Sequence, residues 1–137
     1  MTDRLIPQPV GLNAEFYAHA AAGRLHFQRC LACSTWRHPP RFLCAACGSD
    51  QWLWQPSTGR GRVFTWTVTH RPIDPAFEPP YAVVVVETDE GVRVVGSLSD
   101  LHPAALALDL PVEIVLEPVN ESVALLAFRP ASSSSSV

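Results

Sequence analysis

Four cysteines constrain this chain more than any other feature. They are Cys30, Cys33, Cys44 and Cys47, two C-x2-C pairs separated by ten residues. Each pair can chelate an ion from a single tight turn, and two pairs complete a tetrahedron of thiolates, which suits zinc. Gly48 follows the second pair, where a residue free to take positive φ lets backbone N–H groups turn toward the sulfurs. Ser34 holds the same place after the first pair and would fit it less easily.

Two disulfides or four free thiols are the competing interpretations of this pattern. We expect a soluble, cytoplasmic protein, because the first residues lack the layout of a signal peptide and no apolar run approaches a membrane span of about 20 residues. Disulfides are rare in that compartment, and no thioredoxin-like context accompanies the pairs. We therefore expect a structural metal, with iron as the rival to zinc. Four thiolates leave no open position for catalysis.

The N-terminal region predicts an extended arm followed by a short helix. Leu12, Phe16 and Ala20 share one face at helical spacing. Asn13 is the expected N-cap of a helix over about residues 13–22, and Gly23 is the expected stop signal. A helix this short is marginal alone, so its apolar face must dock on another element.

The remainder of the chain predicts β-structure. We expect strands over residues 61–69, 81–87, 92–98, 112–116 and 122–128, with a short helix or turn near residues 103–108. Five strands with a late helical turn are typical of an OB-type barrel. The predicted fold is therefore mostly β, in four parts: arm and helix (1–23), zinc ribbon (24–50), five-stranded barrel (51–130) and a disordered serine-rich tail (131–137).

The charged residues exclude some chemistry and are unevenly spread. Ten arginines and no lysine rule out a Walker-type phosphate loop and a lysine Schiff base. Residues 24–71 carry seven arginines against Asp50, a net charge of +6, whereas residues 72–137 carry two arginines against ten acids, a net charge of −8. The first part is suited to anions, and the second opposes binding to polyanions in general.

A series of short motifs resembles the acyl-CoA-associated OB-fold proteins that carry an N-terminal rubredoxin-like zinc ribbon. The motifs are Gly23-Arg-Leu, Arg29-Cys30-Leu-Ala-Cys33, Pro39-Pro40-Arg41, Cys44-Ala-Ala-Cys47-Gly48-Ser49, Ser57-Thr58-Gly59-Arg60-Gly61, Thr69-His70-Arg71, Phe77, Pro79-Pro80-Tyr81, Asp89-Glu90-Gly91-Val92-Arg93 and Phe128-Arg129-Pro130. Each is modest alone, but their order and spacing are specific over about residues 12–130. Ser34 departs from the glycine that is usual there.

This resemblance implies a non-catalytic partner of a thiolase-like enzyme in lipid metabolism. Such partners include thiolases, hydroxymethylglutaryl-CoA synthases, acyltransferases and the lipid-transfer-type aldolases of steroid side-chain degradation. The implied assembly is a hetero-oligomer of two plus two chains, with acyl-CoA as a shared ligand. The chain itself offers no nucleophile beside a base outside the metal site, so we expect no turnover from it alone.

Several residues are candidates for contact with CoA or with the partner. Five arginines fall near the ribbon–barrel junction: Arg37, Arg41, Arg60, Arg62 and Arg71. Arginine binds phosphate through two donors, although simple solvation is the alternative. Phe77 and Tyr81 border a proline-rich loop and are suited to a pantetheine arm or a partner surface, with core burial equally open for Tyr81. We also expect Phe16 to be exposed for docking.

A single-stranded nucleic-acid-binding module is the alternative function, since ribbons and OB-folds bind single strands elsewhere. That interpretation rests on fold analogy alone. Such binders need a basic groove lined with stacking aromatic side chains. The net charge of −8 over residues 72–137 repels a phosphate backbone, so we favour the accessory subunit.

Overall fold

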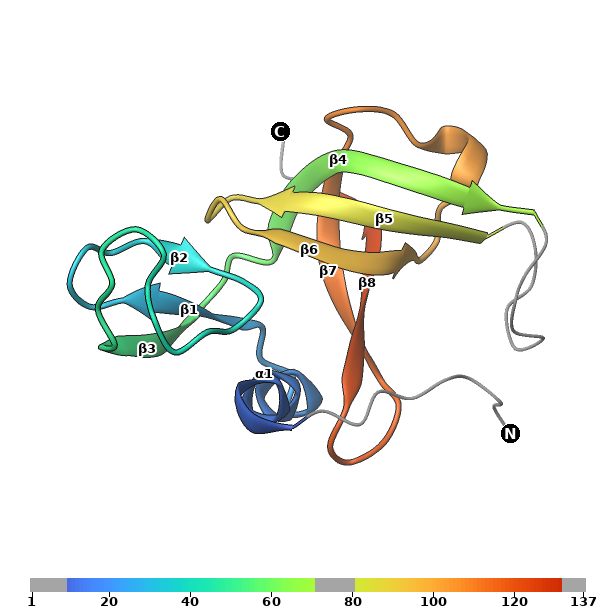
Figure 1. The fold of residues 1–137 in the computed structure, drawn as a ribbon. Helices are drawn as coiled ribbons and strands as arrows, with labels where there is room; N and C mark the ends of the chain where they lie inside the picture. Colours follow the sequence, from blue (N-terminus) through green and yellow to red (C-terminus); the bar gives the residue numbers. More distant parts are fainter. Residues whose placement is uncertain (1–9, 71–80, 132–137) are drawn as a thin grey trace.

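The computed structural model describes residues 10–70 and 81–131. A helix and a small sheet lie beside a barrel (Figure 1). The elements are α1 (Gly11–Ala21), β1 (His26–Cys30), β2 (Trp36–Arg37), β3 (Trp52–Pro56), β4 (Arg60–Thr69), β5 (Tyr81–Thr88), β6 (Arg93–Leu98), the 3-10 turn η1 (Pro103–Ala105), β7 (Pro111–Pro118) and β8 (Ala124–Pro130). The mostly β architecture predicted from the sequence is confirmed.

Helix α1 begins earlier than its sequence predicts. Its N-cap is Val10, which makes no side-chain cap hydrogen bond, so the expected Asn13 cap is wrong. Leu12 is buried on the helix face and must lie inside the helix, so packing sets the start in place of a capping side chain. The C-terminal stop at Gly23 is confirmed. Gly23 takes φ +83°, and the N–H groups of Gly23 and Arg24 donate to Ala20 and His19 in a Schellman arrangement.

The ribbon sheet has the strand order β2-β1-β3, with β1 antiparallel to both neighbours. Strand β3 pairs with β1 along its whole length, from Trp52 opposite Cys30 to Pro56 opposite His26. The ribbon sheet therefore reaches Pro56, beyond the boundary at residue 50 expected from the sequence. The sequence predicts β-structure after the ribbon, but it does not say which sheet residues 52–56 join.

The barrel closes in the order β4-β5-β6-β8-β7. Strand β4 pairs with both β5 and β7, and the circle is completed by a short parallel pairing of β6 with β8 at Ser97 and Leu98. Gly96 permits this closure, because a Cβ atom there would lie 2.5 Å from the Leu126 carbonyl oxygen. The five predicted barrel strands and the late helical turn are all present.

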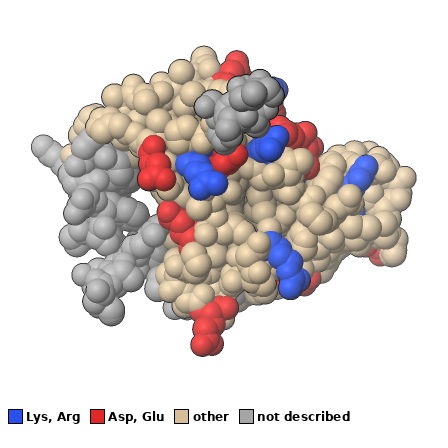
Figure 2. Space-filling model, turned by 180° about the vertical axis from the view of Figure 1, so that it is seen from behind, with Lys and Arg blue, Asp and Glu red and all other residues tan. Residues whose placement is uncertain are grey.

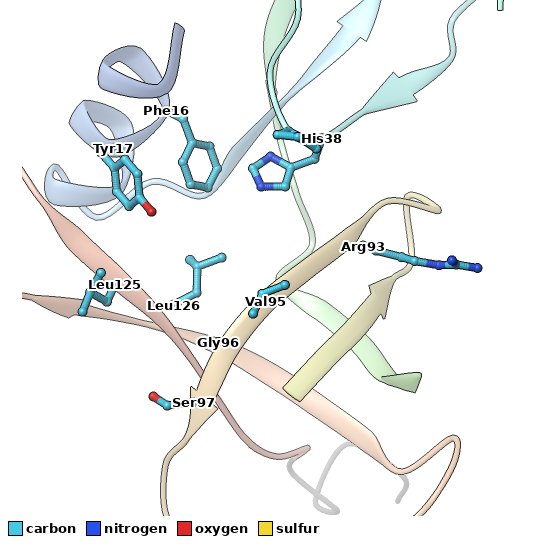
Figure 3. Close-up of a pocket in the computed structure, with 10 residues that line it drawn as sticks. Phe16, Tyr17, His38, Arg93, Val95, Gly96, Ser97, Leu125 and Leu126 are labelled. Atoms are coloured by element: carbon cyan, nitrogen blue, oxygen red, sulfur yellow. The ribbon is translucent and has the colours of Figure 1, made fainter. Parts of the chain in front are cut away.

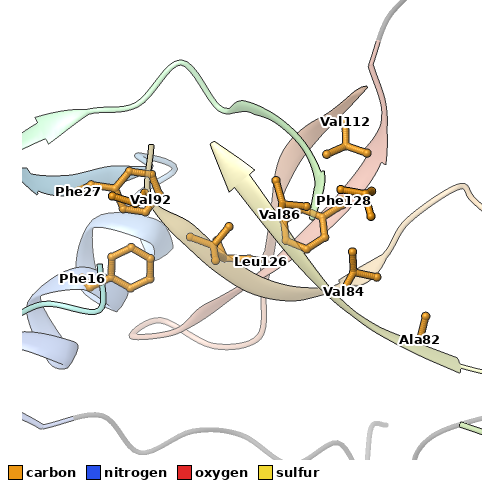
Figure 4. Packing of buried hydrophobic residues seen from close by; sticks show 11 residues of the cluster. Phe16, Phe27, Ala82, Val84, Val86, Val92, Val112, Leu126 and Phe128 are labelled. Carbon is orange, nitrogen blue, oxygen red and sulfur yellow. The ribbon is translucent and has the colours of Figure 1, made fainter. Parts of the chain in front are cut away.

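One apolar cluster joins the helix, the ribbon and the barrel (Figure 4). Inward-facing barrel residues form most of it: Val63, Val84, Val86, Val94, Val112 and Phe128, each at most 1% exposed. Phe27 of β1 and Phe16 of α1 extend the cluster, with ring centroids 6.2 Å apart. Phe16 is only 4% exposed, so the expected role of its ring as a free docking surface is wrong. The helical face that favoured docking on a partner docks within the chain.

Candidate metal centre and ribbon–barrel groove

The four cysteine sulfurs converge on one point of the ribbon. All four Sγ atoms lie within 4.8 Å of one another, and the pairs Cys30–Cys47 and Cys33–Cys44 are each 3.6 Å apart. A tetrahedron with zinc–sulfur bonds of 2.3 Å has edges of about 3.8 Å. The sulfur spacing therefore fits a tetrahedral thiolate site.

The two cysteine turns have matching backbone geometry. The N–H of Ser34 donates to the Cys30 carbonyl at 2.9 Å, and the N–H of Gly48 donates to the Cys44 carbonyl at 2.7 Å. Both residues take positive φ, +67° at Ser34 and +79° at Gly48. Ser34 thus adopts the conformation that glycine provides in the second turn, at the conformational cost of a side chain there.

Hydrogen bonds favour the thiolate form at two of the four sulfurs, Cys33 and Cys30. At Cys47 the backbone N–H of Ser49 lowers the pKa, but the neighbouring thiols and burial together raise it to about 12 in the absence of an ion. The side chain of Thr35, followed by its backbone N–H, lowers the pKa of Cys33 to about 6. The backbone N–H of Cys33 lowers the pKa of Cys30. These donors hydrogen-bond to the sulfurs, as groups that neutralise thiolate charge around a bound ion do. The donor set and its surroundings therefore fit a divalent metal.

A buried glutamine organises the segment between the two turns. Gln28 is fully buried, and its Oε1 accepts from Arg37 Nε at 2.9 Å and from the Arg41 N–H at 2.7 Å. Arg37 Nη2 also donates to the Arg41 carbonyl at 2.6 Å. Arg37 is therefore occupied in holding the ribbon together. The side chain of Arg41 is exposed and makes no hydrogen bond or ion pair with the described residues.

A groove runs along the surface where the ribbon and helix meet the barrel. It consists of two cavities of about 400 and 340 Å³ that share His38, Pro39 and Arg93 in their walls. The larger lies between α1, β6 and β8 and is mostly apolar, with Phe16, Tyr17 and Leu126 around it (Figure 3). The smaller has polar and apolar surface in nearly equal parts, and Arg37, Arg41 and Glu87 are among its lining residues. Arginine side chains therefore outnumber acids in this groove.

His38 separates the two cavities as a neutral side chain. Its ring packs against Phe16 and Phe27, with centroid distances of 4.7 and 5.2 Å. Burial lowers the pKa of His38 to about 4, and its buried Nδ1 has no hydrogen-bond partner among the described residues. The imidazole is therefore uncharged at neutral pH.

Of the other predicted site residues, the structure places the side chains of Arg60 and Arg62 alone, and both lie outside the groove. Arg60 starts β4, opposite Glu113 of β7, and lines neither cavity. Arg71 and Phe77 lie outside the described residues, as does the side chain of Tyr81, whose backbone begins β5. Their predicted roles in contacting CoA or a partner stay predictions.

Sequence reasoning missed the role of the turn after β5. Glu90 receives hydrogen bonds from the Ser57 hydroxyl at 2.7 Å and from the Thr58 N–H at 2.9 Å, and the Thr58 hydroxyl lies 3.3 Å from Asp89 Oδ2. The turn therefore anchors the connection between β3 and β4. Two adjacent acids in a hairpin turn look solvated in the sequence, because their partners lie more than thirty residues away.

Charge on the barrel alternates locally. Arg62 lies 3.6 Å from both Glu87 and Asp109, and Arg129 lies 3.1 Å from Glu113. The face in Figure 2 shows arginines next to acids and no continuous basic stripe over its described residues. This arrangement gives no support to a nucleic-acid groove there. Within residues 10–70 and 81–131, no helix is long and apolar enough to cross a membrane.

Two family models match the chain in succession. Residues 18–52 match the ChsH2 rubredoxin-like zinc ribbon domain, and residues 54–117 match the ChsH2 C-terminal OB-fold domain. The four clustered cysteines all lie in the first match. The two matches divide the chain between Trp52 and Trp54, inside β3.

Named relatives fall into two kinds. A probable enoyl-CoA hydratase alpha subunit of Thermomonospora curvata is 40% identical over 119 residues, covering 87% of this chain and 37% of the relative. The 3-oxo-4,17-pregnadiene-20-carboxyl-CoA hydratase alpha subunit of Mycobacterium tuberculosis is 37% identical, covering 73% and 32%. The chain thus spans about a third of these two proteins. A DUF35 domain-containing scaffold protein of Methanocaldococcus jannaschii is 30% identical, covering 68% and 67%.

Solved structures agree with these matches. A chain of the Ltp2–ChsH2(DUF35) aldolase superposes with a TM-score of 0.84 at 38% identity, covering 93% of this chain and 100% of the other. A DUF35 protein from Sulfolobus solfataricus superposes with a TM-score of 0.61 at 10% identity, a likeness of fold alone. With both of its regions matched in order, this chain belongs to the ChsH2-type DUF35 family of zinc-ribbon and OB-fold proteins.

Proposed function

We propose that this chain is a non-catalytic accessory subunit of a thiolase-like enzyme that processes acyl-CoA. One observation supports this above the others: the full-length match, at 38% identity, to the ChsH2(DUF35) chain of a two-component aldolase. The name of the archaeal relative, a scaffold protein, is consistent with it. Within residues 10–70 and 81–131, no serine, threonine or cysteine side chain hydrogen-bonds to a histidine, and the Ser57 hydroxyl beside Glu90 belongs to the anchored connection between β3 and β4.

The substrate class follows from the same relatives. One of them is named for a pregnadiene carboxyl-CoA thioester, so we propose a role in the degradation of steroid or other lipid side chains. The partner would be a lipid-transfer-type aldolase, with a thiolase or an acyltransferase as the other members of the class. A homodimeric partner would carry one copy of this chain on each side, giving two plus two chains.

We propose that Cys30, Cys33, Cys44 and Cys47 bind one structural Zn²⁺. The sulfur spacing and the surrounding N–H and hydroxyl donors support this assignment. Bound zinc would fix the two turns and hold the segment from residue 34 to residue 43. With four thiolate ligands the ion has no open position, so its contribution is to folding.

We propose that acyl-CoA is shared between this chain and the partner, with the smaller, arginine-lined cavity of the groove facing the CoA phosphates. Arg41 supports this, since its side chain lines the cavity and is unpaired among the described residues. A guanidinium can hold a phosphate through two donors. Arg71, Phe77 and Tyr81 remain proposed contacts for CoA or the partner, and Arg60 is a weaker candidate because it lines neither cavity.

Co-expression with a thiolase-like subunit encoded in the same genome tests the proposal. We expect the two chains to co-purify in a two plus two complex that turns over an acyl-CoA substrate, with no turnover from this chain alone. Turnover by the purified single chain would overturn the non-catalytic role. Failure of every such subunit to form a complex would overturn the accessory role. In an active complex, Arg41→Ala should raise the Michaelis constant for acyl-CoA, whereas Arg24→Ala, at an exposed arginine outside both cavities, should leave it unchanged.

A further inference from the structure

Two imidazole rings are in contact at the interface between the helix and the ribbon, at the opposite end of β1 from Cys30. His19 lies in the last turn of α1, and His26 is the first residue of β1. The Schellman turn at Gly23 folds the chain back between them, so that their Nδ1 atoms lie 3.1 Å apart. Both side chains are half-buried and remain open to solvent.

The orientation of the rings allows the two Nδ1 atoms to share a hydrogen bond or to face a common ion. Their centroids are 4.6 Å apart, with an angle of 72° between the ring planes. A head-on N–H···N contact of the same length would separate the centroids by about 5.4 Å. A divalent ion about 2.05 Å from both nitrogens would place the centroids about 4.8 Å apart, with an N–metal–N angle near ~98°. The observed separation of 4.6 Å is closer to the value for a shared ion than to the value for a head-on contact.

We propose that His19 and His26 form a second metal site, a bidentate chelate for a divalent transition-metal ion such as Ni²⁺, Cu²⁺ or Zn²⁺. Neutral imidazole suits these ions, and water would complete the coordination sphere. On binding, the ring whose Nδ1 carries a proton moves that proton to its own Nε2, and both Nδ1 lone pairs then face the metal. The inference is independent of the proposed accessory function.

The surroundings support a neutral His26 and an oriented His19. Burial, followed by the charges of His19 and Arg24, lowers the pKa of His26, so that its imidazole is uncharged and able to ligate at neutral pH. The indole of Trp54 packs on His19 with centroids 5.4 Å apart, and its Nε1 donates to Glu15 Oε1 at 3.0 Å. Glu15 lies one turn before His19 on the same face of α1, where its carboxylate favours a nearby cation.

A metal here would tie α1 to the ribbon. The helix has only 11 residues, and its inner face forms part of the shared core through Phe16. Its C-terminal turn is otherwise joined to β1 by the short connection around Gly23. An ion bridging His19 and His26 adds a link between the two elements that neither propensity nor capping supplies.

The experiment uses tag-free, full-length protein already loaded with zinc at the cysteines, titrated with Ni²⁺ by calorimetry and tryptophan fluorescence. We expect one Ni²⁺ per chain and partial quenching of the fluorescence, because Trp54 packs directly on His19. His19→Gln and His26→Gln should each weaken Ni²⁺ binding at least tenfold and remove the quenching. His70→Gln, an exposed histidine after β4, should behave as wild type.

Zinc content and the far-ultraviolet spectrum of each variant establish that the ribbon and helix are intact. His19 lies in α1 and His26 in β1, so a substitution that unfolds one element need not unfold the other. One folded variant is sufficient for the test. Absence of Ni²⁺ binding to the wild-type chain would overturn the proposal. So would Ni²⁺ binding that survives in a folded His19→Gln or His26→Gln variant, or that displaces zinc from the cysteines in equal amount.

Discussion

The ribbon and the barrel are stabilised by different means. The barrel buries a continuous set of valines with Phe128 at its centre. The ribbon has few buried residues, chiefly Phe27, Gln28, Cys30 and Cys44, and one of these is a glutamine. The barrel can therefore rely on apolar burial, whereas the ribbon depends on the proposed zinc and on polar contacts. The comparison predicts that different perturbations unfold the two regions.

Loss of a metal ligand should have the largest effect and should be confined to the ribbon. Structural zinc in small domains contributes roughly 10–16 kcal/mol, so Cys44→Ser should release the ion and unfold residues 24–56. The barrel should remain folded on its own core. Metal analysis and hydrogen exchange measure the two parts separately, with Ser34→Gly as a control that keeps all four thiols. Full zinc content in Cys44→Ser would contradict the assignment.

Removing Phe16 should affect both regions, since its ring joins them. Phe16→Ala creates a cavity in the shared cluster and should lower the free energy of unfolding by about 3–5 kcal/mol. Phe42→Ala is the matched control, because Phe42 is 68% exposed on the ribbon. Its substitution should change stability by about 0.5 kcal/mol or less. Equal effects in denaturant unfolding would mean that Phe16 does not form part of the core.

Acid should weaken the junction through His38. Its pKa is about 4 in the folded chain and about 6.5 when unfolded, so the unfolded state binds more protons between these values. The free energy of unfolding should fall by about 3 kcal/mol as pH drops from 6.5 to 4. His38→Phe should remove this component. Urea unfolding of wild type and variant at each pH gives the difference between their free energies of unfolding. The thiols titrate in both proteins, so their contribution cancels in this difference. A difference that does not change with pH would contradict burial of a neutral imidazole.

What could be predicted from the sequence depended on whether the signal was local. The cysteine spacing and the alternating strands lie within short segments, and the structure places them as predicted. The missing Asn13 cap, the burial of Phe16 and the pairing of β3 with β1 depend on contacts between distant segments. Periodicity identifies which face of an element is apolar, but it does not identify what covers that face.

The same limit applies to the groove. His38 and Arg93 are far apart in sequence and line the same cavities, because the ribbon folds onto the start of β6. No spacing rule joins them. Among the predicted arginines, Arg41 lines the groove and Arg60 does not, although both looked alike in a charge count.

The smallest expected effect concerns the connection between the two regions. Glu90 accepts hydrogen bonds from Ser57 and Thr58, which follow the last ribbon strand. Glu90→Gln keeps the shape but removes the charge and one acceptor, so the free energy of unfolding should fall by about 1 kcal/mol. Glu121→Gln, at an exposed position in the β7–β8 loop, should have no measurable effect. Because residues 57–59 carry no apolar burial that could replace these bonds, amide exchange at Thr58 should rise more than exchange within β1 or β4. A uniform rise across both regions would instead show that the turn stabilises the whole chain and not the connection alone.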